Sequence, residues 1–111
     1  MLDWVEYRKE LLGRIGELGR ISPDTVKGYQ VLSGAKTGSL DAKTRELIAL
    51  AVAVTARCDG CITVHTAEAL KHGATHEEMA DALSVAVSVN AGAALVYSAR
   101  VMDAVQAHEK T

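Results

Sequence analysis

The stretch Cys58-Asp-Gly-Cys61-Ile-Thr-Val-His65 holds both cysteines of this 111-residue chain and one of its four histidines. If the stretch is helical, Cys58 and Cys61 are three positions apart and Cys61 and His65 four. The three side chains then share one helix face. Two thiols and an imidazole on one face can carry out thiol–disulfide chemistry or bind a metal ion. The residues around the stretch decide between these two kinds of site.

The rest of the sequence predicts an all-α protein of about six helices in a single domain, residues 1–111. The aromatic content is only 4% and alanine is abundant, which favours helices that approach each other closely. Apolar residues recur at helical spacing along most of the chain. The expected helices cover about residues 3–18, Pro23 to beyond Leu32, Asp41 to Ala56, Cys58 to His72, Thr75 to Asn90, and the segment after Gly92.

Capping signals mark several of these helix ends. Asp41 is a good N-cap, and Thr75-His-Glu-Glu78 has the pattern of a capping box. Gly73 follows the helix that begins at the cysteines, as a C-cap glycine would. Asn90-Ala-Gly92 is typical of a break between two helices, which gives the expected count of about six.

The charge pattern excludes some classes of partner and favours one compartment. The formal net charge is −2, with acidic and basic residues interspersed, so the chain lacks the basic stripe that binds nucleic acid. The start Met1-Leu-Asp-Trp-Val-Glu has neither the positive charge nor the apolar run of a signal peptide. We therefore expect a cytoplasmic protein. In a reducing compartment a CxxC pair is more often catalytic or metal-binding than a structural disulfide.

The side chains available for a core are small, which predicts a homo-oligomer. A short chain with so few large residues has little bulk to bury within itself, so some apolar helix surface is expected to be buried between subunits. The segment Ala82–Ala99 has no charged residue but is interrupted by serine, asparagine and glycine. We expect this segment to form buried helices or a subunit contact, and not to cross a membrane.

Glu46 is the acidic residue most suitably placed to assist the cysteine motif. It precedes Cys58 by 12 residues, which is too far in one continuous helix. If the chain reverses near Arg57, Glu46 lies about 16 Å back from the turn, whereas His65 lies about 10 Å and Cys61 about 5 Å along the returning helix. Glu46 is then nearest in height to His65. We expect it to orient or accept a proton from His65, which polarises Cys61.

These residues resemble a known family. Glu46 within Lys43-Thr-Arg-Glu-Leu-Ile, the spacing Cys58-x-x-Cys61-x-x-x-His65 and the segment Gly73-Ala-Thr-x-Glu-Glu78 are similar to the alkylhydroperoxidase AhpD-like core. That core belongs to the carboxymuconolactone decarboxylase-like superfamily, and the resemblance covers about residues 40–104. It implies an all-α fold that assembles as trimers or hexamers. It also implies an antioxidant peroxidase or thiol–disulfide oxidoreductase that needs no cofactor or metal and is reduced by a lipoylated or thioredoxin-like partner.

The resemblance also implies a role for each site residue. Cys61 would attack the peroxide and form a sulfenic acid, which Cys58 would resolve as a disulfide. His65 and Glu46 would form the proton relay. In the best-known peroxidases of the family a histidine precedes the second cysteine, whereas this chain has Gly60. The resemblance implies a peroxide or a small disulfide as the substrate. Because one relay residue is missing, a general disulfide reductase or an enzyme with another substrate also stays open.

Three other interpretations remain open. The two cysteines could be small buried side chains with no chemistry. A zinc site could take ligands from Cys58, Cys61, His65 and Glu46, although structural zinc usually draws on a second pair of cysteines or histidines. A decarboxylase-like enzyme could use His65 and Glu46 alone, although the decarboxylases of the superfamily lack this cysteine pair.

Overall fold

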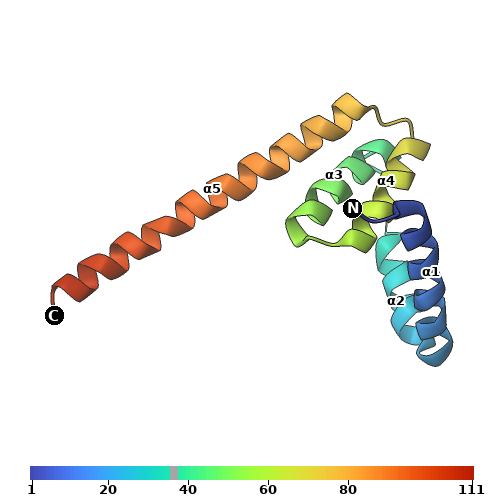
Figure 1. The fold of residues 1–111 in the computed structure, drawn as a ribbon, viewed down its shortest axis with the longest axis horizontal. Coiled ribbons are helices and arrows are strands. Elements are labelled where there is room, and N and C mark those ends of the chain that lie inside the picture. The colour runs from blue at the N-terminus through green and yellow to red at the C-terminus, as the bar shows by residue number, and fades with distance from the viewer. Residues whose placement is uncertain (36–37) are drawn as a thin grey trace.

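The computed structural model describes residues 1–35 and 38–111, which form five helices and no strand (Figure 1). The all-α class expected from the sequence is therefore confirmed. The helices are α1 (Trp4–Ile21), α2 (Pro23–Ser33), α3 (Ala42–Ala56), α4 (Asp59–Lys71) and α5 (His76–Glu109).

The expected helix break at Asn90-Ala-Gly92 was wrong, because α5 continues through Asn90 and Gly92; the described residues therefore form five helices where about six were expected. The side chain of Asn90 donates to the Ala86 carbonyl at 2.7 Å and to Thr55 Oγ1 of α3 at 2.8 Å. Its amide is therefore satisfied inside the helix and does not compete with the helical backbone. Gly92 is flanked by alanines, and their high helix propensity offsets its cost of about 1 kcal/mol.

The predicted caps are present and define the turns between helices. Asp41 accepts a hydrogen bond from the Thr44 N–H at 2.7 Å, and Thr75 and Glu78 form the reciprocal capping box. Arg57 ends α3 in the left-handed conformation, with φ of 54°. This conformation turns the chain back on itself, as the expected reversal requires, so α4 returns alongside α3.

The helices pack in two groups that meet at α4. On one side, α3 packs against α4 and against the first part of α5. On the other, α1 packs against α2 and α4. The buried cluster in the first group is small: Leu50, Ala69 and Ala74, with Leu47 and Met79 packed against it.

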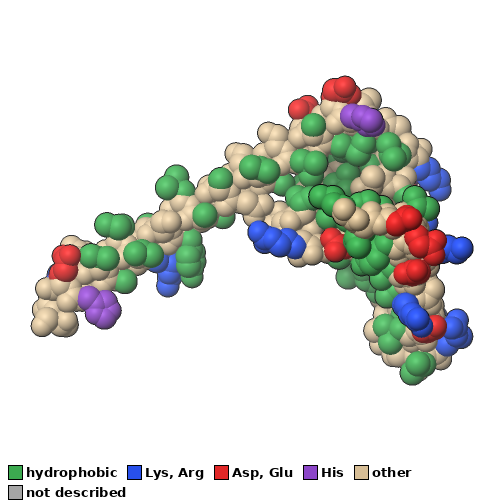
Figure 2. Space-filling view, in the orientation of Figure 1, with side chains coloured by type: hydrophobic (Ala, Val, Ile, Leu, Met, Phe, Trp, Pro, Cys, Tyr) green, Lys and Arg blue, Asp and Glu red, His purple; other side chains and the backbone are tan. Residues whose placement is uncertain are grey.

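The second half of α5 extends away from the other helices, and much of its apolar surface is exposed (Figures 1 and 2). The radius of gyration is 19.0 Å, against about 13 Å for a compact domain of this length. The chain exposes 8659 Å², against about 5,900 Å² for a compact monomer of its mass. Ala82–Ala99 is thus largely exposed in one chain. Burial inside the monomer therefore does not explain why this segment has no charged residue.

Among the described residues, α5 is also the one helix long and apolar enough to cross a membrane, judged by length and composition. Only 6% of its most apolar window is buried. The larger exposed apolar side chains on α5 are Leu83, Val85, Val87, Val89, Leu95, Val96, Tyr97, Val101, Met102 and Val105.

Candidate functional site

The two cysteines lie where α4 begins. Cys58 is the N-cap residue, and its sulfur accepts a hydrogen bond from the Cys61 backbone N–H at 3.2 Å. The left-handed turn at Arg57 places it there, and the Cys58 backbone N–H bonds to the Ala53 carbonyl at 3.1 Å. A helix N-terminus carries a partial positive charge and free N–H groups. A thiolate at Cys58 would therefore be stabilised.

Cys58 and Cys61 are joined by a disulfide, and their Cα atoms are 5.3 Å apart. This separation lies in the usual range for disulfides. Both residues are half-buried, so the bond is partly accessible to other molecules. The CxxC spacing thus forms a short ring at the helix end, in a geometry compatible with a redox cycle.

Glu46 of α3 and His65 of α4 form a close pair. His65 Nδ1 lies 2.7 Å from Glu46 Oε2, and the two side chains are 29% and 20% exposed. A carboxylate at Nδ1 favours the tautomer with the hydrogen on that nitrogen, which leaves Nε2 to exchange a proton. The antiparallel return of α4 brings this pair together, at the relative height expected from the sequence.

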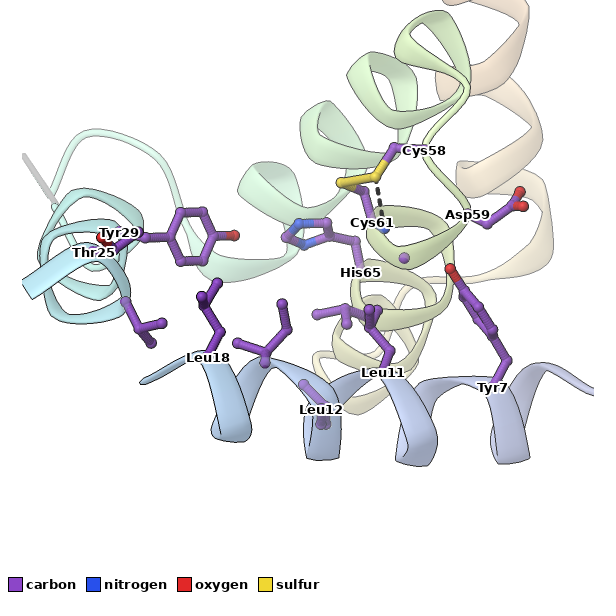
Figure 3. Close-up of a pocket in the computed structure, with 14 residues that line it drawn as sticks. Tyr7, Leu11, Leu12, Leu18, Thr25, Tyr29, Cys58, Asp59, Cys61 and His65 are labelled. Carbon is purple, nitrogen blue, oxygen red and sulfur yellow. Dashed lines mark hydrogen bonds between the residues drawn. A yellow bond between two sulfur atoms is a disulfide. The ribbon is translucent and has the colours of Figure 1, made fainter. Parts of the chain in front are cut away.

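A cavity of about 570 Å³ opens onto the disulfide and His65 (Figure 3). It lies between α1, α2 and the start of α4. Its walls are mostly apolar side chains, with Cys58, Cys61 and His65 at one side. The remaining lining residues are Tyr7, Leu11, Leu12, Ile15, Leu18, Thr25, Val26, Tyr29, Asp59, Gly60 and Val64.

The walls formed by α1 and α2 were not identified as part of a site from the sequence. The amphipathic pattern of α1 was visible, but a pattern alone does not show whether an apolar face covers a core or a cavity. Tyr29 of α2 is one of these wall residues. Figure 3 shows its ring and that of His65 facing each other across the cavity.

Gly60 allows α1 to lie close to the start of α4. A Cβ atom added at Gly60 would lie 2.7 Å from Leu11 Cδ2, well inside van der Waals contact. Thr63 adds a second link, because its buried hydroxyl donates to the Trp4 carbonyl at 2.9 Å. In this chain Leu11 therefore occupies the space beside Gly60 into which a larger residue would project.

The ligands that a zinc site would need are not assembled in the part of the chain that the structure describes. Within residues 1–35 and 38–111, no group of three or more His, Cys, Asp or Glu side chains is arranged to hold a metal ion. The sulfurs of Cys58 and Cys61 are bonded to each other, and Glu46 bonds to His65.

Comparison with known proteins identifies relatives over most of the chain. The sequence profile of the carboxymuconolactone decarboxylase family matches residues 23–104. An uncharacterized protein of Haemophilus influenzae is 50% identical over 104 residues, which is 92% of each chain. An uncharacterized protein of Cupriavidus necator is 36% identical over 84% of each chain.

A similar structure is also known. The crystal structure of an apo carboxymuconolactone decarboxylase family protein from Legionella pneumophila superposes with a TM-score of 0.73. It is 35% identical, and the match covers 86% of this chain and 88% of that one. The stretch matched by the sequence profile, residues 23–104, contains Glu46, Cys58, Cys61 and His65. The similar structure supports the same all-α family fold.

Proposed function

Because the chain belongs to the carboxymuconolactone decarboxylase family, we propose that it is a thiol–disulfide oxidoreductase that reduces a hydroperoxide or a small disulfide. The observation that carries this proposal is the Cys58–Cys61 disulfide at a helix N-terminus, open to a cavity that His65 also lines. A structural disulfide would need neither the cavity nor the Glu46–His65 pair beside it.

The oxidative half-reaction begins at Cys61 in the reduced protein. His65 accepts the Cys61 proton, and the thiolate attacks the terminal oxygen of the hydroperoxide. A sulfur–oxygen bond forms, the oxygen–oxygen bond breaks, and the leaving alkoxide takes the proton from His65. Cys58 then attacks the Cys61 sulfenic acid, which forms the disulfide and releases water. Two thiols are oxidised and one hydroperoxide is reduced to an alcohol.

The reductive half-reaction uses an external dithiol, and the family resemblance favours a lipoylated or thioredoxin-like one. Its thiolate attacks Cys61 and expels Cys58, whose thiolate is stabilised by the helix N-terminus. The second thiol of the reductant then releases Cys61. Cys61 is thus the sulfur that meets outside molecules in both halves of the cycle, and Cys58 is its internal partner.

Thiol counting tests this function. The reduced wild-type protein should lose two thiols per chain when one equivalent of cumene hydroperoxide or a small disulfide is added. Cys61→Ser should keep its remaining thiol under the same conditions. If wild-type protein keeps both thiols against every peroxide and disulfide offered, the oxidoreductase proposal is wrong.

A second candidate follows from the Glu46–His65 pair, which could move a proton on a small molecule without help from the thiols. This would make the chain a decarboxylase-like enzyme, as the family name describes. Such an activity would survive replacement of both cysteines by serine, whereas the oxidoreductase activity would be lost.

The exposed side of α5 supports a further proposal, that copies of this chain assemble through it as a trimer or hexamer. The exposed area exceeds that of a compact monomer by about 2,800 Å², and each partner in a standard interface buries about 800 Å². Light scattering on the purified protein should give three or six chains. Leu95→Asp should reduce this number, and a monomeric wild-type protein would contradict the proposal.

A further inference from the structure

The cavity is large enough for a substrate much bigger than hydrogen peroxide. Its volume is about 570 Å³, whereas a cavity of about 150 Å³ in another protein binds benzene, a molecule of six carbon atoms. On this scale the cavity has room for roughly a dozen to two dozen non-hydrogen atoms. Most of this space is not needed to react a peroxide group with one sulfur.

The shape of the cavity is extended because α1 forms one long wall. Leu11, Ile15 and Leu18 recur every three or four residues and all line it. From Leu11 to Leu18 this wall runs about 10 Å at 1.5 Å per residue. Figure 3 shows Leu11 toward the end where α4 begins and Leu18 toward Tyr29 and Thr25 of α2. A chain-like group can therefore lie along α1 while its end reaches the disulfide.

The charges around the cavity disfavour an anion. Among the described residues, 1–35 and 38–111, no lysine or arginine lines the cavity, and the one lining carboxylate is Asp59, next to Cys58. The polar groups toward α2 are the uncharged hydroxyls of Thr25 and Tyr29. A carboxylate placed in this cavity would lose water without gaining a cationic partner, and that loss is costly.

We infer that the cavity binds an uncharged substrate with an extended apolar group, held along Leu11, Ile15 and Leu18 so that its peroxide or disulfide end meets Cys61. This inference rests on the proposed function for the reactive end only. The apolar chain, the absence of negative charge and the position along α1 follow from the cavity walls.

Binding to the oxidised wild-type protein tests the inference without any turnover. The probes are 1-butanol, 1-hexanol, 1-octanol, 1-decanol and decanoate, measured by displacement of a fluorescent apolar dye. The affinity of the alcohols should rise by up to about fourfold per CH₂ group. Decanol should bind at least tenfold more tightly than decanoate. Equal affinity for decanol and decanoate, no rise with chain length, or no binding of decanol would overturn the inference.

A charge placed in the cavity should reverse the preference. Ile15→Lys puts a cation on the α1 wall, and it should favour decanoate over decanol by at least tenfold. Ile21→Lys is the matched control, since Ile21 is on the same helix, 84% exposed and not a lining residue. It should keep the wild-type preference. Both variants are checked for helix content by circular dichroism. If Ile21→Lys shifts the preference as much as Ile15→Lys, the site does not lie along this wall.

The experiment separates this inference from the proposed function. If decanol binds as expected but the reduced protein consumes no peroxide or disulfide, the cavity inference stands and the oxidoreductase proposal fails. If turnover occurs with the same rate constant for hydrogen peroxide and cumene hydroperoxide, and decanol does not bind, the oxidoreductase proposal stands and the cavity inference fails.

Discussion

Replacing Glu46 by glutamine tests the proton relay, because it removes the negative charge and keeps the size and shape of the side chain. The bond from Glu46 to His65 is short, at 2.7 Å, and the two side chains are largely but not fully buried. A hydrogen bond to a charged group contributes about 1.5–3 kcal/mol. If that stabilisation acts in the transition state, its loss slows the reaction by about 10- to 100-fold. Partial exposure to water places the expected effect near the lower value.

The assay is the rate of thiol loss when the reduced protein meets excess cumene hydroperoxide, followed by stopped flow between pH 5 and 9. Glu46→Gln should be about tenfold slower than wild type near neutral pH. The matched control is Glu68→Gln, because Glu68 of α4 also lies near a histidine, His72 at 3.7 Å, but His72 does not line the cavity, whereas His65 does. Glu68→Gln should react at the wild-type rate. An unchanged rate and pH profile for Glu46→Gln would remove Glu46 from the mechanism.

Three further substitutions test the surroundings of the site. Gly60→Ala should lower stability to thermal unfolding by about 1 kcal/mol despite the higher helix propensity of alanine. In a protein that already carries Leu11→Ala, the same Gly60→Ala substitution should no longer cause this loss. Thr63→Val should cost about 1–2 kcal/mol, since it removes the hydroxyl that donates to the Trp4 carbonyl of α1. The hydrogen bond from Lys43 holds the pKa of Glu78 below its ordinary value. The stabilisation by this ion pair is therefore fully present when the pH is above the ordinary pKa of a glutamate, and it is lost as the pH falls through the lower pKa of Glu78 in the folded protein. Lys43→Met should reduce the acid dependence of the free energy of unfolding.

The sequence was sufficient for the parts of the site that depend on local spacing. The Cys58–Cys61 pair and the cap at Thr75 follow from residues three positions apart. The Glu46–His65 contact required one more step, the chain reversal at Arg57, and helical rise then placed the two residues at similar heights.

The parts that could not be predicted depend on contacts between distant segments. Asn90 looks like a helix breaker until Thr55 of α3 is seen to accept its hydrogen bond. The cavity exists because α1 lies against Gly60, some 50 residues later in the sequence, and no local pattern gives that position. For the same reason Tyr29 could not be assigned to the cavity wall.

The measurement that tests the central claim most directly is the identity of the sulfur that meets peroxide first. Reduced Cys58→Ser and Cys61→Ser proteins are mixed with one equivalent of cumene hydroperoxide and dimedone, which traps sulfenic acids, and the adduct is located by peptide mass spectrometry. We predict an adduct on Cys61 in Cys58→Ser and at most a trace on Cys58 in Cys61→Ser. A faster or equal reaction at Cys58, or no adduct in either protein, would contradict the account.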